Sequence, residues 1–533
     1  MIAERYKFDF SVLSLATTFR QNFKSMIEKV KNYYKNHPLN TILGVGLLLR
    51  LLSAIFSKGY GMTDDHFKII EEAQSLLIGQ LTDEWVPIEG TGGGKRSMLY
   101  PYLHYLFFKL LESIQITDPQ VKMYFVRFIH AFYSMLTIVF SFKIMELLSD
   151  KKWAARIGWI AAMFWFLPMM SVRNLVEVVS MPLLLWGTYI LLRYERNLAS
   201  LKHVFIAGVV FSFAFTIRFQ AVSFIGGIVF FLMYKKYWKA LILLGLGGLL
   251  PFVFNHIFIE SILFDFPLFG KLINYIEFNL ENSTTYVIGP WYNYALLFLG
   301  IFIPPLSIIM LIGLFKASRK YLILSLPFFC FFLFHSFFPG KQERFVLPIL
   351  MFFPILGFLG YRMLIDGNAW WSKHQKFFQT SWKIFWVINI IVLIPITLTY
   401  SKRSKVEAMY HLSPLEMNEK DYILYCADRF SAIGNMPYYY MKAERYPAYM
   451  RIYEDVHMAT VLDELKTKET AEYPDFIFLF HHDKMDERLE EFKTVMPNLS
   501  FEKTMQASFI DRFMHWLNPK NRNYSIDIYR NKK

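Results

Sequence analysis

The chain has 533 residues, of which 55% are hydrophobic, 19% are aromatic and 19% are charged, and its mean hydropathy is +0.30. A soluble protein carries about 25% charged residues, so these values exclude an ordinary soluble protein, a disordered chain, a coiled coil and a collagen. The net charge of +14 suggests a nucleic-acid partner at first. However, the basic residues gather in short loops between apolar runs, which indicates a polytopic membrane protein in a lipid bilayer and no nucleic-acid partner.

Residues 1–38 are basic and contain no apolar run that ends in a small-residue cleavage site, so we expect no cleavable signal peptide there. A basic flank before the first apolar run places this segment in the cytoplasm. We expect residues 39–400 to form the membrane domain, with about eleven spans. The apolar runs lie at 41–56, 123–148, 154–170, 179–194, 203–217, 221–234, 238–258, 291–315, 320–337, 345–365 and 382–400.

The loops between these runs alternate in charge. Every second loop is basic, including those with Lys151, Arg193 and Lys316, which is typical of cytoplasmic loops. The long loops 58–122 and 259–290 hold more acids than bases, so we place them outside the cytoplasm. An odd number of spans, with the N-terminus inside, then places the C-terminus outside.

The remaining segment, 401–533, is predicted to be a soluble extracytoplasmic domain with a small α/β fold. No nucleotide-binding fingerprint follows any of its predicted strands. The fold class is therefore an all-α polytopic membrane protein with a small C-terminal α/β domain. The strands are predicted at 421–427, 475–482 and 524–530, and amphipathic helices at 456–468 and 486–496.

The 58–122 loop holds the most unusual polar sequence. It begins with GMTDDH at 61–66, continues to TDEW at 82–85, and then runs through TGGGK to RSMLYP at 96–101. Paired carboxylates such as Asp64 and Asp65 can act as a general base toward an acceptor hydroxyl. They could instead only cap the helix that follows. The TGGGK stretch lacks the preceding strand of a phosphate loop, which favours a flexible linker.

Further polar residues interrupt the apolar runs. Arg173 and Asn174, with Glu177, lie in the turn before the fourth run, and Arg218 lies between two apolar runs. An arginine near lipid is costly and usually has a partner or a function. The stretch HSFFPGKQERF at 335–345 supplies a lysine and an arginine that could anchor the chain at the membrane interface or bind a phosphate group.

Together these features suit the transfer of a sugar from a lipid phosphate carrier to an acceptor outside the cytoplasmic membrane. Basic residues at the membrane boundary can neutralise a phosphate leaving group, and aromatic walls can admit an isoprenoid chain. Such a reaction needs no nucleotide-sugar site. No pair of histidines has the spacing of metal ligands, so we predict no metal and no cofactor.

In these motifs the chain resembles the glycosyltransferases of the GT-C fold, and most closely the Alg9-like mannosyltransferase group, glycosyltransferase family 22. The matching elements occur in the family's order from residue 40 to 365, which makes the resemblance more specific than any single motif. The family's His-Pro-Asp-Glu element corresponds to 62–65, its Thr-Trp-Glu-Trp-like stretch to 82–85, its Arg-Ser-x-x-Tyr-Pro to 96–101, its Tyr-Gly-x-x-Pro-Trp to 286–291, and its His-Ser-x-x-x-His-Lys-Glu-x-Arg-Phe to 335–345.

The sequence departs from the family pattern at several positions. Met62-Thr63 replaces His-Pro and the acidic pair is Asp-Asp, so either carboxylate can be the base. Gly340 and Gln342 stand where the family has His and Glu, and Tyr286 and Gly289 are spaced differently from the family's Tyr-Gly.

The resemblance implies an inverting transferase that moves a hexose, expected to be mannose, from a polyprenyl-phosphate carrier to a glycan or glycolipid acceptor. Asp64 would be the base, and Asp65 would position the acceptor or share the base role. The donor phosphate would contact Lys341, Arg344, Arg96 and Arg218, and the substrates would contact His66, Trp85, Tyr100, Tyr286, Trp291 and His335.

Two other functions remain open from the sequence. A transporter or flippase of lipid-linked sugars could use the same basic and aromatic residues for binding alone, but we find no internal repeat of the kind that transporters show. Another activity of the GT-C fold, such as protein glycosylation, is the second alternative. We expect a bacterial inner membrane protein with its active site on the extracytoplasmic side, the endoplasmic reticulum membrane being the alternative.

Overall fold

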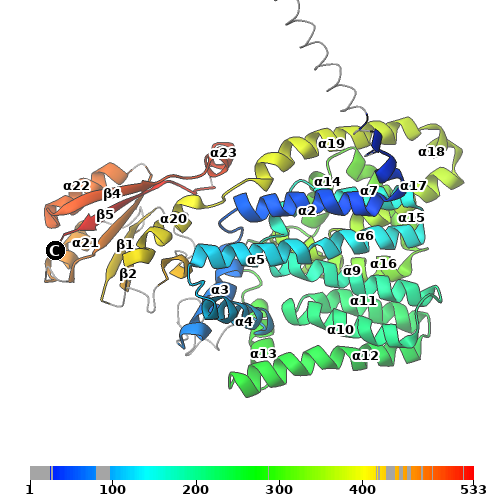
Figure 1. Cartoon of the computed structure of the whole chain (residues 1–533), viewed down its shortest axis with the longest axis horizontal. Coiled ribbons are helices and arrows are strands. Elements are labelled where there is room, and N and C mark those ends of the chain that lie inside the picture. The colour runs from blue at the N-terminus through cyan, green and yellow to red at the C-terminus, as the bar shows by residue number, and fades with distance from the viewer. Residues whose placement is uncertain are drawn as a thin grey trace, which may run out of the picture.

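A computed structural model shows a long helical bundle joined to a smaller sheet domain (Figure 1). The structure describes residues 25, 28–29, 31–79, 96–285, 287–415, 417, 420–427, 438–442, 448–452, 458–469, 472–482, 484–519 and 521–532. Within these ranges, only the backbone is described for residues 63, 64, 438, 448, 449 and 451.

The bundle is built from helices that run mostly alongside one another (Figure 1). Local sequence explains where several of them begin. Asp118 caps α5 by accepting a hydrogen bond from the amide of Val121 at 2.8 Å, and Pro119 occupies the first helical position. Asp150 caps α7 in the same way. The helices of the first half are α2 (Pro38–Phe56), α3 (Thr63–Ile78), α4 (Leu99–Ser113), α5 (Pro119–Tyr133), α6 (Met135–Leu148), α7 (Lys151–Met163), α8 (Leu167–Met170), α9 (Val176–Glu195) and α10 (Leu201–Ile217).

The second half of the bundle contains two irregular helices. The π-helix η1 continues α12, and the 3-10 helix η2 precedes α17. The elements are α11 (Ala221–Tyr234), α12 (Trp238–Val253), η1 (Phe254–Leu263), α13 (Gly270–Glu281), α14 (Asn293–Ile301), α15 (Leu306–Ser318), α16 (Leu322–Phe337), η2 (Glu343–Ile349), α17 (Phe352–Gly367), α18 (Ala369–Lys373) and α19 (Gln375–Thr397).

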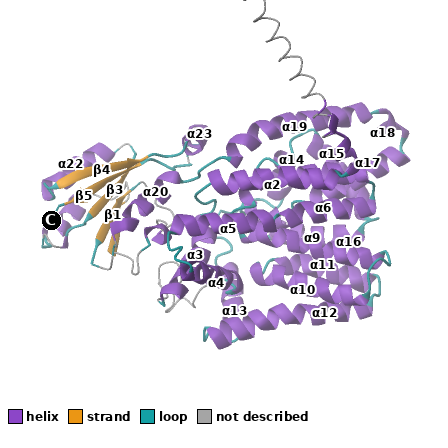
Figure 2. Ribbon diagram, in the orientation of Figure 1, coloured by secondary structure: helices purple, strands orange, loops and turns teal. Residues whose placement is uncertain are grey.

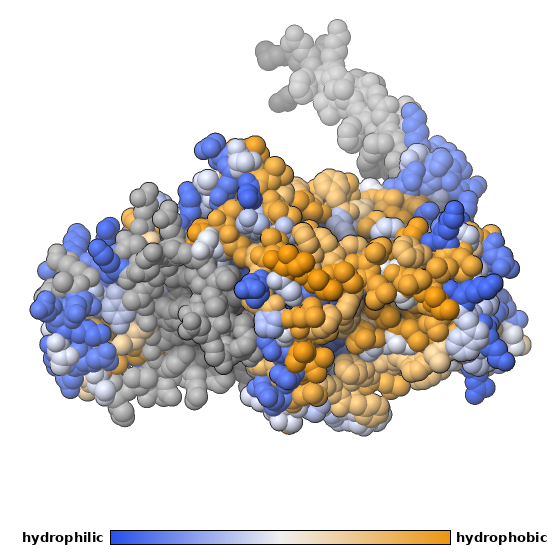
Figure 3. Space-filling model, turned by 90° about the horizontal axis from the view of Figure 1, so that it is seen from below, coloured by the Kyte–Doolittle hydropathy of each residue, from blue (hydrophilic) through white to orange (hydrophobic). Residues whose placement is uncertain are grey.

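All eleven predicted apolar runs are largely helical. Among the described residues, five helices are long and apolar enough to cross a membrane, or seven if each of two bent helix pairs is one span. The protein is therefore a multi-pass membrane protein, while eleven spans and an inside N-terminus stay predictions. Hydrophobic residues cover much of the bundle surface, and hydrophilic residues gather toward the two ends of the molecule (Figure 3).

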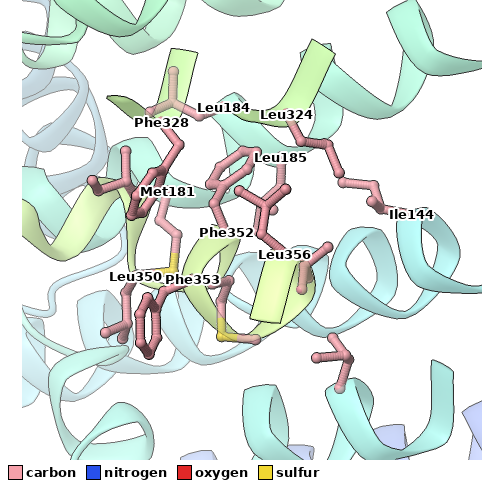
Figure 4. Packing of buried hydrophobic residues seen from close by; sticks show 14 of the residues in the cluster. Ile144, Met181, Leu184, Leu185, Leu324, Phe328, Leu350, Phe352, Phe353 and Leu356 are labelled. Atoms are coloured by element: carbon pink, nitrogen blue, oxygen red, sulfur yellow. The ribbon is translucent and has the colours of Figure 1, made fainter. Parts of the chain in front are cut away.

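Apolar packing in the bundle core determines where α9, α16 and α17 lie relative to one another. Met181 and Leu184 of α9 pack with Phe328 of α16 and with Phe352 and Phe353 of α17 (Figure 4). On α15 and α17, Gly313 and Gly360 allow such close backbone approach that a side chain at either position would collide with the other helix. This packing fixes the start of α9 beside η2, where the polar side chains described below meet.

The C-terminal domain contains a five-stranded mixed sheet in the order β2-β1-β3-β5-β4 (Figure 2). Strands β2, β1 and β3 are parallel, whereas β5 pairs antiparallel with both β3 and β4. The three predicted strands and two predicted helices are confirmed as β1, β3, β5, α21 and α22. The bounds are α20 (Arg403–Leu412), η3 (Ser413–Leu415), β1 (Tyr422–Cys426), η4 (Tyr438–Met441), β2 (Ala448–Ile452), α21 (Met458–Lys466), β3 (Phe476–Phe480), α22 (Met485–Val495), β4 (Leu499–Met505), α23 (Phe509–Leu517) and β5 (Ile526–Asn531).

One face of this sheet shares a hydrophobic core with the bundle. Phe478 of β3 belongs to the same buried cluster as Tyr60, Phe67 of α3, Phe108 of α4 and Tyr440 of η4. The sheet domain is therefore packed onto the 58–122 loop rather than only tethered to it.

Candidate active site

A buried ion-pair cluster joins the 58–122 loop to the segment after α16. Asp65, in the first turn of α3, forms ion pairs with Arg96, which precedes α4, and with Arg344, in η2. Asp65 is only 2% exposed, whereas the Arg96 side chain is 28% exposed. The cluster therefore opens toward the surface on the side of Arg96.

Glu177 is the second carboxylate of this cluster. It lies in the first turn of α9, is fully buried, and accepts a hydrogen bond from Arg218 Nη1 at 2.7 Å. The same Glu177 oxygen lies 3.6 Å from Arg344 Nε, so Arg344 bridges the two carboxylates. We name Asp65, Arg96, Glu177, Arg218 and Arg344 the arginine cluster.

The arginine cluster carries three guanidinium groups and two carboxylates, so it has an excess positive charge. Within the described structure, Arg96 Nη1 and Arg218 Nε and Nη2 are buried without a hydrogen-bond partner. Buried donors that lack acceptors are energetically costly and uncommon in native proteins. This arrangement is suited to an anionic ligand whose oxygens accept from the open donors.

An aromatic ring lies under two of these arginines. The guanidinium carbons of Arg218 and Arg344 lie 5.4 and 5.7 Å from the centre of the Phe345 ring, and the ring of His335 lies 6.2 Å from it. Nδ1 of His335 lies 2.9 Å from the carbonyl oxygen of Phe331, one turn earlier in α16. His335 thus borders the cluster and remains close to both Arg218 and Lys341.

Lys341 is placed differently from the other predicted phosphate ligands. Its Nζ donates hydrogen bonds to the carbonyl oxygens of His335 at 3.0 Å, Ser336 at 2.9 Å and Phe338, at the end of α16. Burial lowers the pKa of Lys341. Among the described residues Lys341 forms no ion pair with the carboxylates of the arginine cluster, and it serves as a cap of α16.

The two later motifs lie side by side. The amide of Lys341 donates to the carbonyl oxygen of Val287 at 2.8 Å, and Ile288 and Gly340 form an isolated β-bridge. Trp291, in the same segment, is 62% exposed and packs edge-on against its neighbour Tyr292. Tyr286, like Trp85, lies outside the described residues.

Tyr100 lies at the start of α4 and packs against Val176 and Val179 of α9. Its Oη is 2.6 Å from His130 Nε2. Burial raises the pKa of Tyr100 well above its usual value, so the phenol remains protonated. Tyr100 is therefore a buried packing residue next to Glu177.

His66 follows Asp65 directly but joins another polar group. It lines a small cavity together with Arg173 and Asn174, and its ring stacks on Tyr60 at 6.0 Å. Burial lowers the pKa of His66 well below its usual value, and the charges of Arg173 and Arg127 add to this effect. The imidazole is therefore neutral near pH 7.

Of the predicted residues, Asp65, Arg96, Arg218 and Arg344 thus come together, whereas Lys341 and Trp291 do not join them. The side chain of Asp64 lies outside the description. Glu177 was noted in the sequence beside Arg173 and Asn174 but was assigned no role, although a glutamate next to an apolar run indicates a partner or a function. In the described residues, no group of three or more histidine, cysteine, aspartate or glutamate side chains is arranged to hold a metal ion.

A family profile and the fold comparisons identify the chain as a membrane glycosyltransferase of the GT-C class. The profile of the Alg9-like mannosyltransferase family matches residues 41–441, so the chain belongs to this family. No curated protein sequence matches the chain.

The solved structures that resemble the chain include ArnT from Cupriavidus metallidurans in two states. With undecaprenyl phosphate bound, ArnT has a TM-score of 0.58 at 12% identity, over 92% of this chain and 97% of ArnT. The apo state of ArnT has a TM-score of 0.60 at 11% identity, over 93% of this chain and 98% of ArnT. The oligosaccharyltransferase AglB from Archaeoglobus fulgidus has a TM-score of 0.48 at 11% identity, over 89% of this chain and 73% of AglB. The ArnT matches show a common fold.

Proposed function

We propose that the protein is an inverting transferase that moves a hexose, mannose by family membership, from a polyprenyl-phosphate carrier to a glycan or glycolipid acceptor outside the cytoplasm. The observation that carries the proposal is the arginine cluster. Its excess positive charge and open buried donors on Arg96 and Arg218 suit a phosphate group at the edge of the membrane domain. ArnT, which shares the fold, has been solved with undecaprenyl phosphate.

An apolar groove supports a lipid-linked donor. It has a volume of about 690 Å³ and lies between α11 and α16, with Phe230, Leu333, Phe334 and Phe337 among its walls. The groove reaches Pro339, two residues before Lys341. An isoprenoid chain in this groove would have its phosphate end near the segment that leads into Arg344.

In the proposed reaction, the Asp64 carboxylate takes the proton of the acceptor hydroxyl while the hydroxyl oxygen attacks the anomeric carbon. The bond between that carbon and the phosphate oxygen breaks, and the lipid phosphate leaves with the electron pair. The arginine cluster stabilises the charge on this leaving group. Asp65 holds Arg96 and Arg344 in place, which leaves Asp64 as the carboxylate for the base role.

The test uses the purified full chain with radiolabelled polyprenyl-phosphate mannose and extracted envelope glycolipids. We expect labelled glycolipid to form, with the anomeric configuration of the mannose inverted. Arg344→Gln serves as the impaired control, and Glu502→Gln, in the sheet domain, as the unimpaired one. If mannose stays on the carrier with every glycolipid fraction while another polyprenyl-phosphate hexose is transferred, that hexose replaces mannose as the proposed sugar. If no polyprenyl-phosphate hexose is transferred, the proposal is overturned.

A further inference from the structure

A second set of buried polar side chains lies beside the arginine cluster. His66 of α3, Arg127 of α5, Arg173 and Asn174 before α9, and Tyr440 of η4 are each no more than 3% exposed. We name these five residues the second basic pocket. His66, Arg173 and Asn174 line one cavity of about 10 Å³, which must widen to admit an ion. Arg127 and Tyr440 do not line it but lie within electrostatic reach of Arg173.

Many polar atoms of this pocket are buried without a hydrogen-bond partner in the described structure. They include Nη1 and Nη2 of Arg127, and Nε and Nη1 of Arg173. Both ring nitrogens of His66 and the hydroxyl of Tyr440 are also buried without a hydrogen-bond partner. Native proteins leave few such groups, and a concentration of them in one place is typical of a site that binds a polar ligand.

The charge of the pocket points to the kind of ligand. Arg127 donates to the carbonyl oxygen of Ala54 at 2.8 Å, and Arg173 to the hydroxyls of Ser57 and Ser401 at 2.9 and 3.1 Å. These partners are neutral, and no carboxylate of the described residues forms an ion pair with either arginine. The arginine cluster, by contrast, contains two carboxylates of its own.

Two buried guanidinium groups without a counterion are unfavourable, because each loses hydration and they repel each other. Burial and the charge of Arg127 lower the pKa of Arg173 to about 9, with Asp511 acting weakly in the opposite direction. At neutral pH both arginines are nevertheless charged. A bound anion would remove the repulsion and accept from the open donors at once.

We propose that the second basic pocket binds an oxyanion, a phosphate or carboxylate group of one of the substrates. Arg127 and Arg173 supply the charge, and Asn174 and Tyr440 supply neutral donors. The source of the oxyanion rests on the proposed function: it is either the lipid phosphate of the donor or an anionic group on the acceptor. His66 follows Asp65, so the pocket lies one residue from the arginine cluster along α3.

The experiment compares Arg127→Gln and Arg173→Gln in the purified full chain. Thermal unfolding is measured alone, with undecaprenyl phosphate and with inorganic phosphate, and acceptor saturation is measured in the transfer assay. We expect both variants to be at least as stable as the parent without ligand, because repulsion is removed. We also expect at least a tenfold loss of apparent affinity for one ligand.

Arg50→Gln is the matched control. Arg50 is also fully buried, but it bonds Ser134 Oγ at 2.9 Å and the carbonyl oxygens of Gly46, Ala161 and Ala162. Its loss should lower stability and leave ligand affinity unchanged.

The two sources of the oxyanion give different results. Weaker stabilisation by undecaprenyl phosphate assigns the pocket to the donor, and a raised KM for the glycolipid acceptor alone assigns it to the acceptor. Destabilised variants with unchanged affinity for every ligand would make the pocket structural and overturn the proposal. The unfolding measurements need no turnover, so they remain decisive even if the proposed transfer reaction fails.

Helix α23 of the sheet domain exposes large apolar side chains. Five of its nine residues are large, apolar and exposed: Phe509, Phe513, Met514, Trp516 and Leu517. Its position is fixed by Asp511, which accepts hydrogen bonds from the amides of Lys402 at 3.2 Å and Arg403 at 3.4 Å. The apolar helix α19 ends at Thr397, so α23 lies beside the point where the chain leaves the bundle (Figure 1).

We propose that the apolar face of α23 inserts into the headgroup region of the bilayer and fixes the sheet domain on the membrane surface. Short amphipathic helices with tryptophan and phenylalanine on one face bind membranes in this way. The polar side of the helix offers Arg512 to anionic headgroups.

The test places an environment-sensitive fluorophore at Trp516→Cys in a Cys330→Ser background, with the full chain in nanodiscs; the native Cys426 is buried. Quenching by lipids that carry a quencher near the headgroup is expected at position 516. Phe501→Cys on β4 is the control, since Phe501 is also exposed but lies on the sheet. Equal quenching at both positions, or none at 516, would overturn the membrane-binding role.

Discussion

Asp65 and Arg344 form an ion pair that joins the first turn of α3 to the 3-10 helix η2. Arg344 also contacts Glu177 of α9, so a single guanidinium group links three parts of the bundle. Its position is set by the packing of α9 against α16 and α17. Any change at Arg344 should therefore act on the charge of the site more than on the backbone.

The first prediction concerns this arginine. Arg344→Gln should weaken binding of the polyprenyl-phosphate donor by about 2–4 kcal/mol, because a buried charge that meets a phosphate is lost. Equilibrium binding of undecaprenyl phosphate to the detergent-purified protein measures the effect. Donor affinity within twofold of the parent would show that the arginine cluster does not bind the phosphate.

The second prediction separates Lys341 from Arg344. Lys341 donates to three carbonyl oxygens at the end of α16, so Lys341→Met should lower the free energy of unfolding by about 1–3 kcal/mol. Donor affinity should change little. Thermal unfolding and donor binding on the same samples give the answer; a large loss of affinity without a loss of stability would return Lys341 to the phosphate site.

Much of this site follows from the sequence. The order of the motifs predicted that Asp65, Arg96 and Arg344 serve one site, and an arginine between apolar runs indicated Arg218. The sequence indicated Glu177 as a charged residue next to a span, but it did not indicate that Arg218 is its ion-pair partner. Ion-pair partners depend on which helix ends meet, and that depends on bundle packing rather than on local pattern.

Other features depend on side-chain direction, which residue order does not determine. Lys341 and Arg344 are three residues apart, yet one turns to backbone carbonyls and the other to carboxylates. Asp65 and His66 are neighbours, yet they enter different polar groups. Arg127 lies inside a predicted span, where only its tertiary surroundings reveal its proximity to Arg173.

The third prediction concerns pH. Burial and two nearby arginines lower the pKa of His66 well below its usual value, so the folded protein keeps this imidazole neutral. The unfolded chain binds a proton below about pH 6.5. Stability should therefore fall as the pH drops from 7 to 5, by at most about 1.4 kcal/mol per pH unit from this group. His66→Gln should show a shallower fall in unfolding temperature.

A suitable control for that comparison is His374→Gln, since His374 is exposed in the loop between α18 and α19. Its unfolding temperature should follow that of the parent at each pH. Identical pH profiles for the parent and His66→Gln would show that His66 is not held neutral in the folded protein.

The last prediction concerns the base. Asp64→Asn keeps the shape of the side chain but removes the proton acceptor, and a positioned base contributes about 10²–10⁴-fold to the rate. We therefore expect kcat to fall by this factor, with donor affinity and unfolding temperature unchanged. Asp65→Asn should behave differently, because it leaves Arg96 and Arg344 without their shared counterion. That variant should lose stability and rate together.

Single-turnover rates, donor binding and thermal unfolding on both variants distinguish the two carboxylates. If Asp64→Asn kept more than about a tenth of the parent rate while Asp65→Asn did not, the base would be Asp65. In that case the ion pairs of Asp65 would have to open when the acceptor binds, since a carboxylate between two guanidinium groups is a weak proton acceptor. If both variants stayed active, the base would lie outside this pair, and Glu177 would be the next carboxylate to test because it is the other acid of the arginine cluster.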